Sequence, residues 1–140
     1  MIYCDASVLV AALTREADTE RVQAWITARK HGNLCISGWV ITEFAGAIAM
    51  KVRTRELPLE ERAPVQASWN ELVANSMLVA EISSSAFELA ARFCEMRNSV
   101  LRPGDALHLA VASLGGHTLA TLDRAMAEAA VQVGVEVMAV

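Results

Sequence analysis

The sequence has no long apolar run. Hydrophobic residues make up 54% of the chain and the mean hydropathy is +0.35. Even so, no stretch approaches the roughly 18–20 uninterrupted apolar residues of a membrane span. The chain does not open with a basic segment followed by an apolar one, so we expect neither a signal peptide nor a membrane partner. The surplus of apolar side chains is instead expected in a large core and a protein interface.

Cysteine is scarce and shows no pairing pattern. Cys4, Cys35 and Cys94 are odd in number, widely spaced and set among apolar residues. We therefore expect free thiols and a reducing, cytoplasmic environment. Because the sequence contains no Cys-x-x-Cys motif, a structural zinc site has little support.

Lysine is also rare. Only two of the 12 basic residues are lysines, and 16 acidic residues give a net charge of −4. An acidic protein does not attract nucleic acid through its overall field. If this chain acts on a nucleic acid, metal ions and a local group of arginines must supply the positive charge, and arginine suits bidentate contacts to phosphate.

The pattern of apolar residues predicts one α/β domain over residues 1–140. Short apolar runs are expected to form strands at 2–4, 34–37, 77–82, 117–122 and 135–140. Helices are expected at 7–13, 18–30, 37–51, 58–75, from 83 or 84 to about 98, at 103–114 and at 123–133, with a loop at 98–102. We expect the 37–51 helix to be buried almost all round, and Pro64 to kink or split its helix. Short strands alternating with helices predict an α/β/α sandwich around a central parallel sheet of about five short strands.

Four acidic residues fall where such a sheet would gather them. Asp5 follows the first strand, Glu43 lies early in the helix after the second, Asp105 opens a helix, and Asp123 follows the fourth strand. Active sites of open parallel sheets form outside the carboxyl ends of the strands. An ionised carboxylate among apolar neighbours needs a partner, and hard oxygen ligands suit Mg²⁺ or Mn²⁺. We therefore predict a metal-binding carboxylate site with at least one raised pKa in the metal-free protein.

Structural roles compete with this interpretation. Asp105 and Asp123 could simply cap helices. Ser7 could orient Asp5, but an N-cap of the first helix is favoured; Thr121 could support the site or be an ordinary strand residue. His108 shares a helix face with Asp105, and a hydrogen-bonded core histidine is favoured over a metal ligand or general base.

Arginines lie close to these acids in the sequence. Arg102 and Arg124 flank two of them, and Arg53 belongs to a basic cluster that follows the Glu43 helix. These side chains could contact the phosphates of a nucleic acid. Solvated faces rich in charge are common, so the cluster at 51–55 is equally well explained as one.

Four segments together resemble the motifs of the PIN-domain family, as found in the VapC toxins of bacterial toxin–antitoxin pairs. Each contains one of the four acids, in the family's order: 2–7 (IYCDAS), 39–44 (WVITEF), 101–110 (LRPGDALHLA) and 118–124 (TLATLDR). Gly104 departs from the family pattern, since a residue with a side chain is more usual before that Asp. Cys4 replaces a commoner aliphatic residue.

The resemblance implies a compact α/β/α fold and Mg²⁺- or Mn²⁺-dependent ribonuclease activity. Asp5, Asp105 and Asp123 would hold the metal, Glu43 would assist, and the products would carry a 5′-phosphate and a 3′-hydroxyl. It also implies a VapB-like antitoxin whose tail occludes the site, and a homodimer. Two alternatives remain: a catalytically inactive PIN-type module that binds RNA or protein, and a phosphatase with Asp5 as nucleophile. The phosphatase is disfavoured because Ser7 stands where a second Asp is needed.

Overall fold

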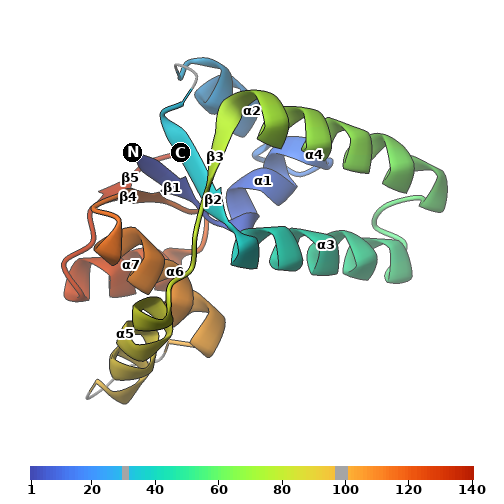
Figure 1. The fold of residues 1–140 in the computed structure, drawn as a ribbon. Coiled ribbons are helices and arrows are strands. Elements are labelled where there is room, and N and C mark those ends of the chain that lie inside the picture. The colour runs from blue at the N-terminus through green and yellow to red at the C-terminus, as the bar shows by residue number, and fades with distance from the viewer. Residues whose placement is uncertain (30–31, 97–100) are drawn as a thin grey trace.

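The protein forms a parallel sheet surrounded by helices (Figure 1). The computed structural model describes residues 1–29, 32–96 and 101–140. In these residues the strands are β1 (Ile2–Cys4), β2 (Leu34–Ser37), β3 (Met77–Ala80), β4 (Thr118–Ala120) and β5 (Val137–Met138). The helices are α1 (Ala6–Leu13), α2 (Thr19–Thr27), α3 (Gly38–Arg53), the 3₁₀-helix η1 (Leu59–Glu61), α4 (Arg62–Ser76), α5 (Ser84–Glu95), α6 (Pro103–Leu114) and α7 (Arg124–Gln132).

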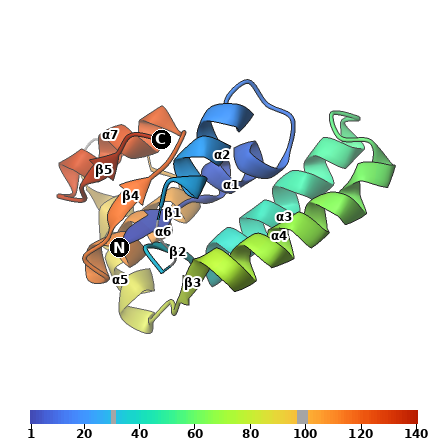
Figure 2. The same ribbon diagram turned by 90° about the horizontal axis from the view of Figure 1, so that it is seen from above.

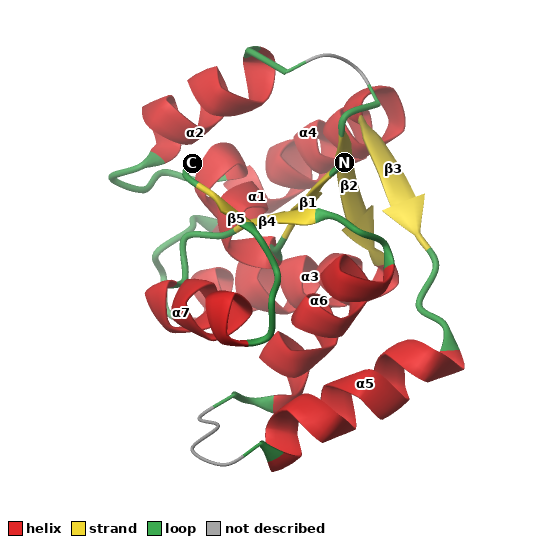
Figure 3. Ribbon diagram, turned by 90° about the vertical axis from the view of Figure 1, so that its left-hand side faces the viewer, coloured by secondary structure: helices red, strands yellow, loops and turns green. Residues whose placement is uncertain are grey.

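The order of the strands creates a switch point at β1. The five strands are parallel and lie in the order β3-β2-β1-β4-β5, so the predicted α/β/α class and strand number are confirmed. Along the chain, β2 and β3 are added on one side of β1, and β4 and β5 are then added on its other side. Figure 3 shows α5, α6 and α7 together on one side of the sheet and α1 and α2 on the other. Ligands of such sheets bind beyond the carboxyl ends of the strands where the order reverses, which here lies between β1 and β4.

Helices α3 and α4 form a hairpin that extends away from the sheet (Figures 1 and 2). The expectation that α3 is buried all round is wrong. Its buried side chains, Val40, Phe44 and Ile48, follow one another at four-residue spacing and form a single stripe, and Phe44 stacks on Trp69 of α4 with 4.0 Å between ring centroids. On the other faces Ile41 and Met50 are 40% and 53% exposed.

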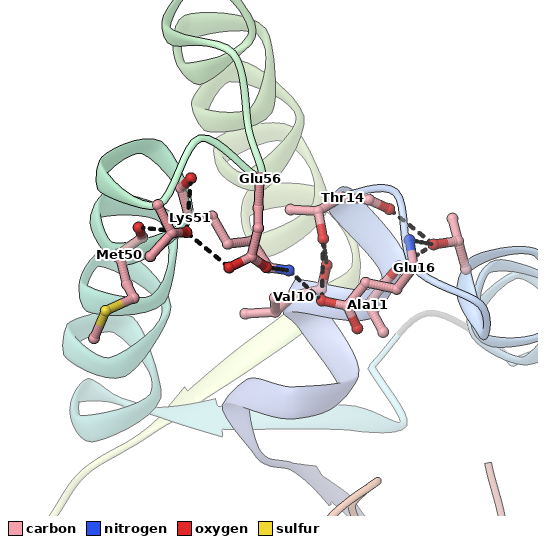
Figure 4. A network of polar contacts seen from close by, with 9 residues as sticks. Val10, Ala11, Thr14, Glu16, Met50, Lys51 and Glu56 are labelled. Atoms are coloured by element: carbon pink, nitrogen blue, oxygen red, sulfur yellow. Dashed lines mark hydrogen bonds and ion pairs between the residues drawn. The ribbon is translucent and has the colours of Figure 1, made fainter.

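The far end of α3 is tied to the loop after α1 (Figure 4). Nζ of Lys51 lies 2.8 Å from a carboxylate oxygen of Glu16 and 3.5 Å from one of Glu56. Nearby, Oγ1 of Thr14 donates to the carbonyl of Val10 at 2.8 Å, which closes the end of α1. This polar cluster joins the outer part of the hairpin to the loop that follows α1.

Most element boundaries differ from prediction by a few residues. Strands β3 and β5 are shorter than expected, and α2 ends at Thr27. The helical segment predicted around Pro64 splits before this residue, into η1 and α4. Pro64 itself does not kink α4. It lies in the first turn, where the N–H that proline lacks would have no partner within the helix. The end of the predicted 18–30 helix and most of the predicted 98–102 loop fall outside the described residues.

Helix α6 forms the centre of the core. Every residue from Ala106 to Ala112 is buried, as its apolar sequence predicts. The helix packs mainly against α5 and also reaches β4. Within the described ranges, no helix is both long and apolar enough to cross a bilayer.

Candidate active site

Asp5 is a buried carboxylate at the switch point of the sheet. It directly follows β1, its backbone N–H donates to the carbonyl of Ala120 at 3.2 Å, and the residue is 4% exposed. Burial raises the pKa of this carboxyl group, although hydrogen bonds from Ser7 and Thr121 and the nearby imidazole of His108 act in the opposite direction. The pKa of Asp5 is thus raised, as predicted for one of the acids, but its cause is burial and not repulsion by another carboxylate.

Two hydroxyl groups hold the Asp5 carboxylate. Oγ of Ser7 donates to Oδ1 at 2.7 Å, and Oγ1 of Thr121 donates to Oδ2 at 3.0 Å. The same hydroxyls accept backbone N–H groups beyond β4, from Leu122 and Asp123, each at 2.9 Å. Each hydroxyl thus joins the end of β1 to the end of β4. For both residues the structure shows the contact with Asp5 that was the alternative to a purely structural role.

The favoured interpretation of Ser7 as an N-cap is wrong. Helix α1 begins at Ala6, and Asp5 itself occupies the N-cap position with extended backbone angles of φ −79° and ψ 175°. Its Oδ1 accepts the N–H of Val8 at 3.4 Å. Because Asp5 caps the helix, the Ser7 hydroxyl is left to bind Asp5 and Leu122.

Glu43 is held by His108. The two come from α3 and α6, and Nε2 of His108 lies 2.6 Å from Oε2 of Glu43. His108 is 2% exposed, whereas the Glu43 side chain is 30% exposed. The expectation of a hydrogen-bonded core histidine is confirmed, and its partner is one of the four predicted acids.

Tyr3 and Ser37 extend this contact into the core. The Tyr3 hydroxyl lies 2.9 Å from Nδ1 of His108 and 2.8 Å from Oγ of Ser37. Both residues are completely buried, and burial raises the pKa of the Tyr3 phenol well above its ordinary value. Sequence reasoning missed these two residues. The available signal was a tyrosine in a buried strand, since a buried Tyr hydroxyl requires a partner.

Gly104 explains how Glu43 and Trp39 fit beside α6. A β-carbon at this position would lie 3.3 Å from Oε1 of Glu43 and 3.2 Å from Nε1 of Trp39. The Trp39 N–H is buried and has no hydrogen-bond partner among the described residues. The departure from the family pattern at Gly104 therefore coincides with a close approach of two site side chains.

Asp105 and Asp123 lie at helix starts and serve there as capping groups. Oδ2 of Asp105 accepts the N–H of Arg102 at 3.3 Å, and Oδ1 of Asp123 accepts the N–H of Met126 at 3.1 Å. The other oxygen of each carboxylate has no hydrogen-bond partner in the part of the chain that the structure describes. Both residues therefore cap helices, as the competing interpretation predicts. One oxygen of each carboxylate takes no part in capping and is available.

The four acids lie at one edge of the sheet but do not form a closed cluster. In the ranges 1–29, 32–96 and 101–140, no three His, Cys, Asp or Glu side chains come close enough together to hold a metal ion. By chemistry the set fits Mg²⁺ or Mn²⁺, because all donors are carboxylate oxygens and a cation would offset the cost of the buried Asp5 charge. The oxygens of Asp105 and Asp123 that take no part in capping are the ones that remain for such an ion.

The predicted arginines separate into two groups. Arg102 and Arg124 are exposed and directly flank α6 and Asp123 at the site. Arg53 lies ten residues beyond Glu43, about 15 Å further along α3 at the helical rise per residue. The structure therefore brings the first two to the acids and places Arg53 at the tip of the hairpin.

Comparison with known proteins identifies the fold. The model of the PIN domain family matches residues 2–132. No curated protein matches. FitAcB from Neisseria gonorrhoeae has a similar solved structure, with a TM-score of 0.72, 20% identity and coverage of 99% of this chain and 96% of that chain.

Two further solved structures share the fold at low identity. VapC20 of Mycobacterium tuberculosis, a toxin that cleaves the sarcin–ricin loop, gives a TM-score of 0.72 at 15% identity, covering 92% of this chain and 95% of that one. VapBC2 from Rickettsia felis, bound to a DNA fragment from its promoter, gives 0.71 at 12% identity, covering 100% and 99%. At these identities the likeness shows a common fold.

Proposed function

The chain belongs to the PIN domain family, and on this premise we propose that it is a metal-dependent endoribonuclease, the toxin of a toxin–antitoxin pair. The observation that carries the proposal is Asp5. This carboxylate is 4% exposed and is held by Ser7 and Thr121 at the switch point of the sheet. A buried charge lowers the stability of the fold, and such a cost is typical of functional sites. The M. tuberculosis neighbour, itself a toxin that cleaves RNA, supports the substrate class.

Each of the four acidic residues has a proposed role in the reaction. Asp5, Asp105 and Asp123 would hold Mg²⁺ or Mn²⁺, and Glu43 would assist. When bound, such an ion activates water for in-line attack on the phosphodiester and stabilises the charge that develops on the phosphate. Cleavage would leave a 5′-phosphate and a 3′-hydroxyl.

The chain's own contacts orient the site. Ser7 and Thr121 fix both oxygens of Asp5, so that this carboxylate does not have to be ordered during the reaction. Arg102 and Arg124, exposed next to α6 and to Asp123, would contact RNA phosphates. Arg53, at the tip of the hairpin, would meet only a longer RNA.

The same proposal names partners. Similar solved structures include FitAB and R. felis VapBC2, each bound to a DNA fragment, and a toxin–antitoxin complex from Klebsiella pneumoniae, which supports a VapB-like antitoxin as partner. We further propose a homodimer, for which the exposed apolar side chains offer surface, among them Leu78, Val79 and Phe87. RNA cleavage and three free cysteines fit a cytoplasmic protein.

The two alternatives make different predictions. An inactive PIN-type module would bind RNA or protein without cutting it, and a phosphatase would form an aspartyl-phosphate on Asp5. Against the phosphatase, Ser7 stands in place of a second acid and uses its hydroxyl to hold Asp5.

The test is cleavage of a structured RNA by the purified protein in Mg²⁺ or Mn²⁺, with and without excess EDTA. We expect cleavage that requires the metal and stops in EDTA. RNA binding without cleavage would favour the inactive module, and cleavage that persists in EDTA would contradict the metal-dependent mechanism.

A further inference from the structure

We propose that Tyr3 and His108 are positioning residues that hold Glu43 in one orientation at the active site. The contacts form a continuous chain from the core to the site: Ser37 to Tyr3, Tyr3 to His108, and His108 to Glu43, at 2.8, 2.9 and 2.6 Å. This proposal deepens the proposed function and rests on it, because Glu43 matters only if the carboxylate site acts on RNA. We call these four residues the Tyr3 relay.

The donors and acceptors of the relay can be assigned from its ends. A carboxylate only accepts, so Nε2 of His108 carries the proton that binds Glu43. When the imidazole is neutral, Nδ1 is left to accept, and the group that faces it is the hydroxyl of Tyr3. Ser37 in turn donates to the Tyr3 oxygen. Ser37 is free to do so because, although it is the N-cap residue of α3, its side chain makes no capping bond. In this form Glu43 sets the tautomer of His108, and the Tyr3 hydroxyl completes its hydrogen bonding at Nδ1.

Burial restricts the motion of three of the four relay residues, and Glu43 is the exception. Tyr3 and Ser37 are fully buried and His108 is 2% exposed, so these polar atoms have no water to exchange partners with. Glu43 alone reaches the surface, with its Oε2 bound to the relay and its Oε1 beside Gly104. One oxygen is thus anchored, and the other lies beside the first turn of α6.

A free glutamate loses rotamer freedom when it is fixed in place. Its side chain has more rotatable bonds than that of aspartate, so ordering it costs more conformational entropy. Asp5 is held by hydroxyls that lie within the site, whereas Glu43 has its imidazole partner on a different helix. The relay therefore gives Glu43 the fixed geometry that Ser7 and Thr121 give Asp5.

A purely structural role is the competing explanation. Buried hydrogen bonds between β1, α3 and α6 would stabilise the fold whether or not Glu43 takes part in a reaction. The two explanations differ in what happens to Glu43 when a distant member of the relay is removed. Only the positioning role predicts that the effect of Tyr3 on cleavage passes through Glu43.

The first experiment uses Tyr3→Phe, alone and combined with Glu43→Gln, with Thr14→Val as control. Thr14→Val also removes a buried hydroxyl that makes a hydrogen bond, but near the hairpin. We expect Tyr3→Phe to lower the single-turnover cleavage rate about tenfold with unchanged RNA affinity, as outer-shell partners do. In the Glu43→Gln background Tyr3→Phe should have no further effect, and Thr14→Val should cleave at the wild-type rate. An equal loss in both backgrounds would overturn the proposal.

The second experiment does not need cleavage. We expect Tyr3→Phe to shift the imidazole ¹⁵N signals of His108 and the carboxyl ¹³C signal of Glu43 in NMR spectra, while Thr14→Val leaves both unchanged. Unchanged Glu43 and His108 signals in folded Tyr3→Phe protein would contradict the relay. A wild-type protein that cuts no RNA would contradict the proposed function, and these signals would still decide whether the relay holds Glu43.

Substitution of His108 gives a further comparison if Tyr3→Phe does not fold. His108→Gln places an amide donor near the position of Nε2, toward Glu43, and His108→Asn places polar atoms near Nδ1, toward Tyr3. We expect Gln to retain most of the cleavage rate and Asn to lose about tenfold. If His108→Asn cleaved as fast as His108→Gln, or faster, the relay would not act on cleavage through Glu43.

Discussion

Oγ1 of Thr121 donates a hydrogen bond of 3.0 Å to Oδ2 of Asp5, which joins the residue after β4 to the residue after β1. The same oxygen accepts the N–H of Asp123 at 2.9 Å. One hydroxyl thus orients one predicted metal ligand directly and the backbone of another. Together with Ser7, it joins the two sides of the switch point.

Replacement of Thr121 by Val should damage the site more than the fold. We expect the cleavage rate to fall about tenfold, since Asp5 loses an orienting donor. The free energy of unfolding should fall by about 1 kcal/mol, because a hydrogen bond to each neighbour is lost. Single-turnover cleavage and urea unfolding measure the two effects. Thr121→Ser is the matched control, and a Ser variant as impaired as the Val variant would contradict the role of the hydroxyl.

The buried charge of Asp5 should cost stability at neutral pH. Burial raises the pKa of Asp5 in the folded state above its value in the unfolded chain. The native state then binds more protons between these two values, so this group's contribution to stability is complete below the unfolded pKa and is lost as pH rises through the folded pKa. Asp5→Asn should therefore melt higher at neutral pH, by about 3 °C for each kcal/mol gained in a domain of this size.

Two features of the Asp5→Asn melting curves check this account. The difference in Tm should shrink as the pH falls, because Asp5 becomes neutral in the wild type. Adding Mn²⁺ should raise the Tm of the wild type and leave Asp5→Asn unchanged, since only a ligand that binds the native state stabilises it. A wild type that melts above Asp5→Asn at neutral pH without metal would contradict the cost assigned to the buried charge.

The place of Asp5 could be predicted from the sequence, but the network around it could not. The apolar run at 2–4 followed by an acid fixes a strand end, and parallel strands bring their ends to one edge. His108 was expected to be a hydrogen-bonded core histidine, yet its partners, Tyr3 and Glu43, lie 105 and 65 residues away in the sequence. Such contacts depend on how β1, α3 and α6 pack, which no local pattern records.

Two local predictions failed for identifiable reasons. The capping role went to Asp5 in place of Ser7, because an extended residue directly after β1 can start α1 one position earlier. Helix α3 has an apolar sequence but buries one stripe, because it leaves the sheet as half of a hairpin. Composition describes how apolar a helix is and does not describe how much of it other elements cover.

Gly104→Ala should separate activity from stability. The added β-carbon would lie within 3.3 Å of Trp39 and Glu43, so one of these side chains must move. We expect cleavage to fall severalfold. The free energy of unfolding should change by less than about 1 kcal/mol, because the higher helix propensity of Ala offsets the unfavourable contact of its β-carbon. Gly38→Ala is the control: Gly38 also opens a helix and has nothing within 4 Å. Equal activity of both variants would show that the close approach at Gly104 does not matter.

Lys51→Met should weaken the attachment of the hairpin. Hydrogen bonding to Glu16 is the largest cause of the raised pKa of Lys51, so its contribution is present at neutral pH and is lost as pH rises through that value. Because surface pairs are screened, we expect a loss of about 0.5–1 kcal/mol in urea unfolding, smaller at high salt. Arg21→Met, which breaks the more exposed pair with Asp18, should cost less. A larger effect at Arg21 would contradict the structural importance of the Lys51 cluster.

The central claim is that Asp5 is the anchor of a metal-dependent site that cuts RNA. The most direct measurement is single-turnover cleavage of one structured RNA by wild-type and Asp5→Asn protein in Mg²⁺ or Mn²⁺, with the product ends analysed and both proteins shown to be folded by melting. We predict 5′-phosphate ends from the wild type and no cleavage by Asp5→Asn. Cleavage by Asp5→Asn at the wild-type rate would contradict the account.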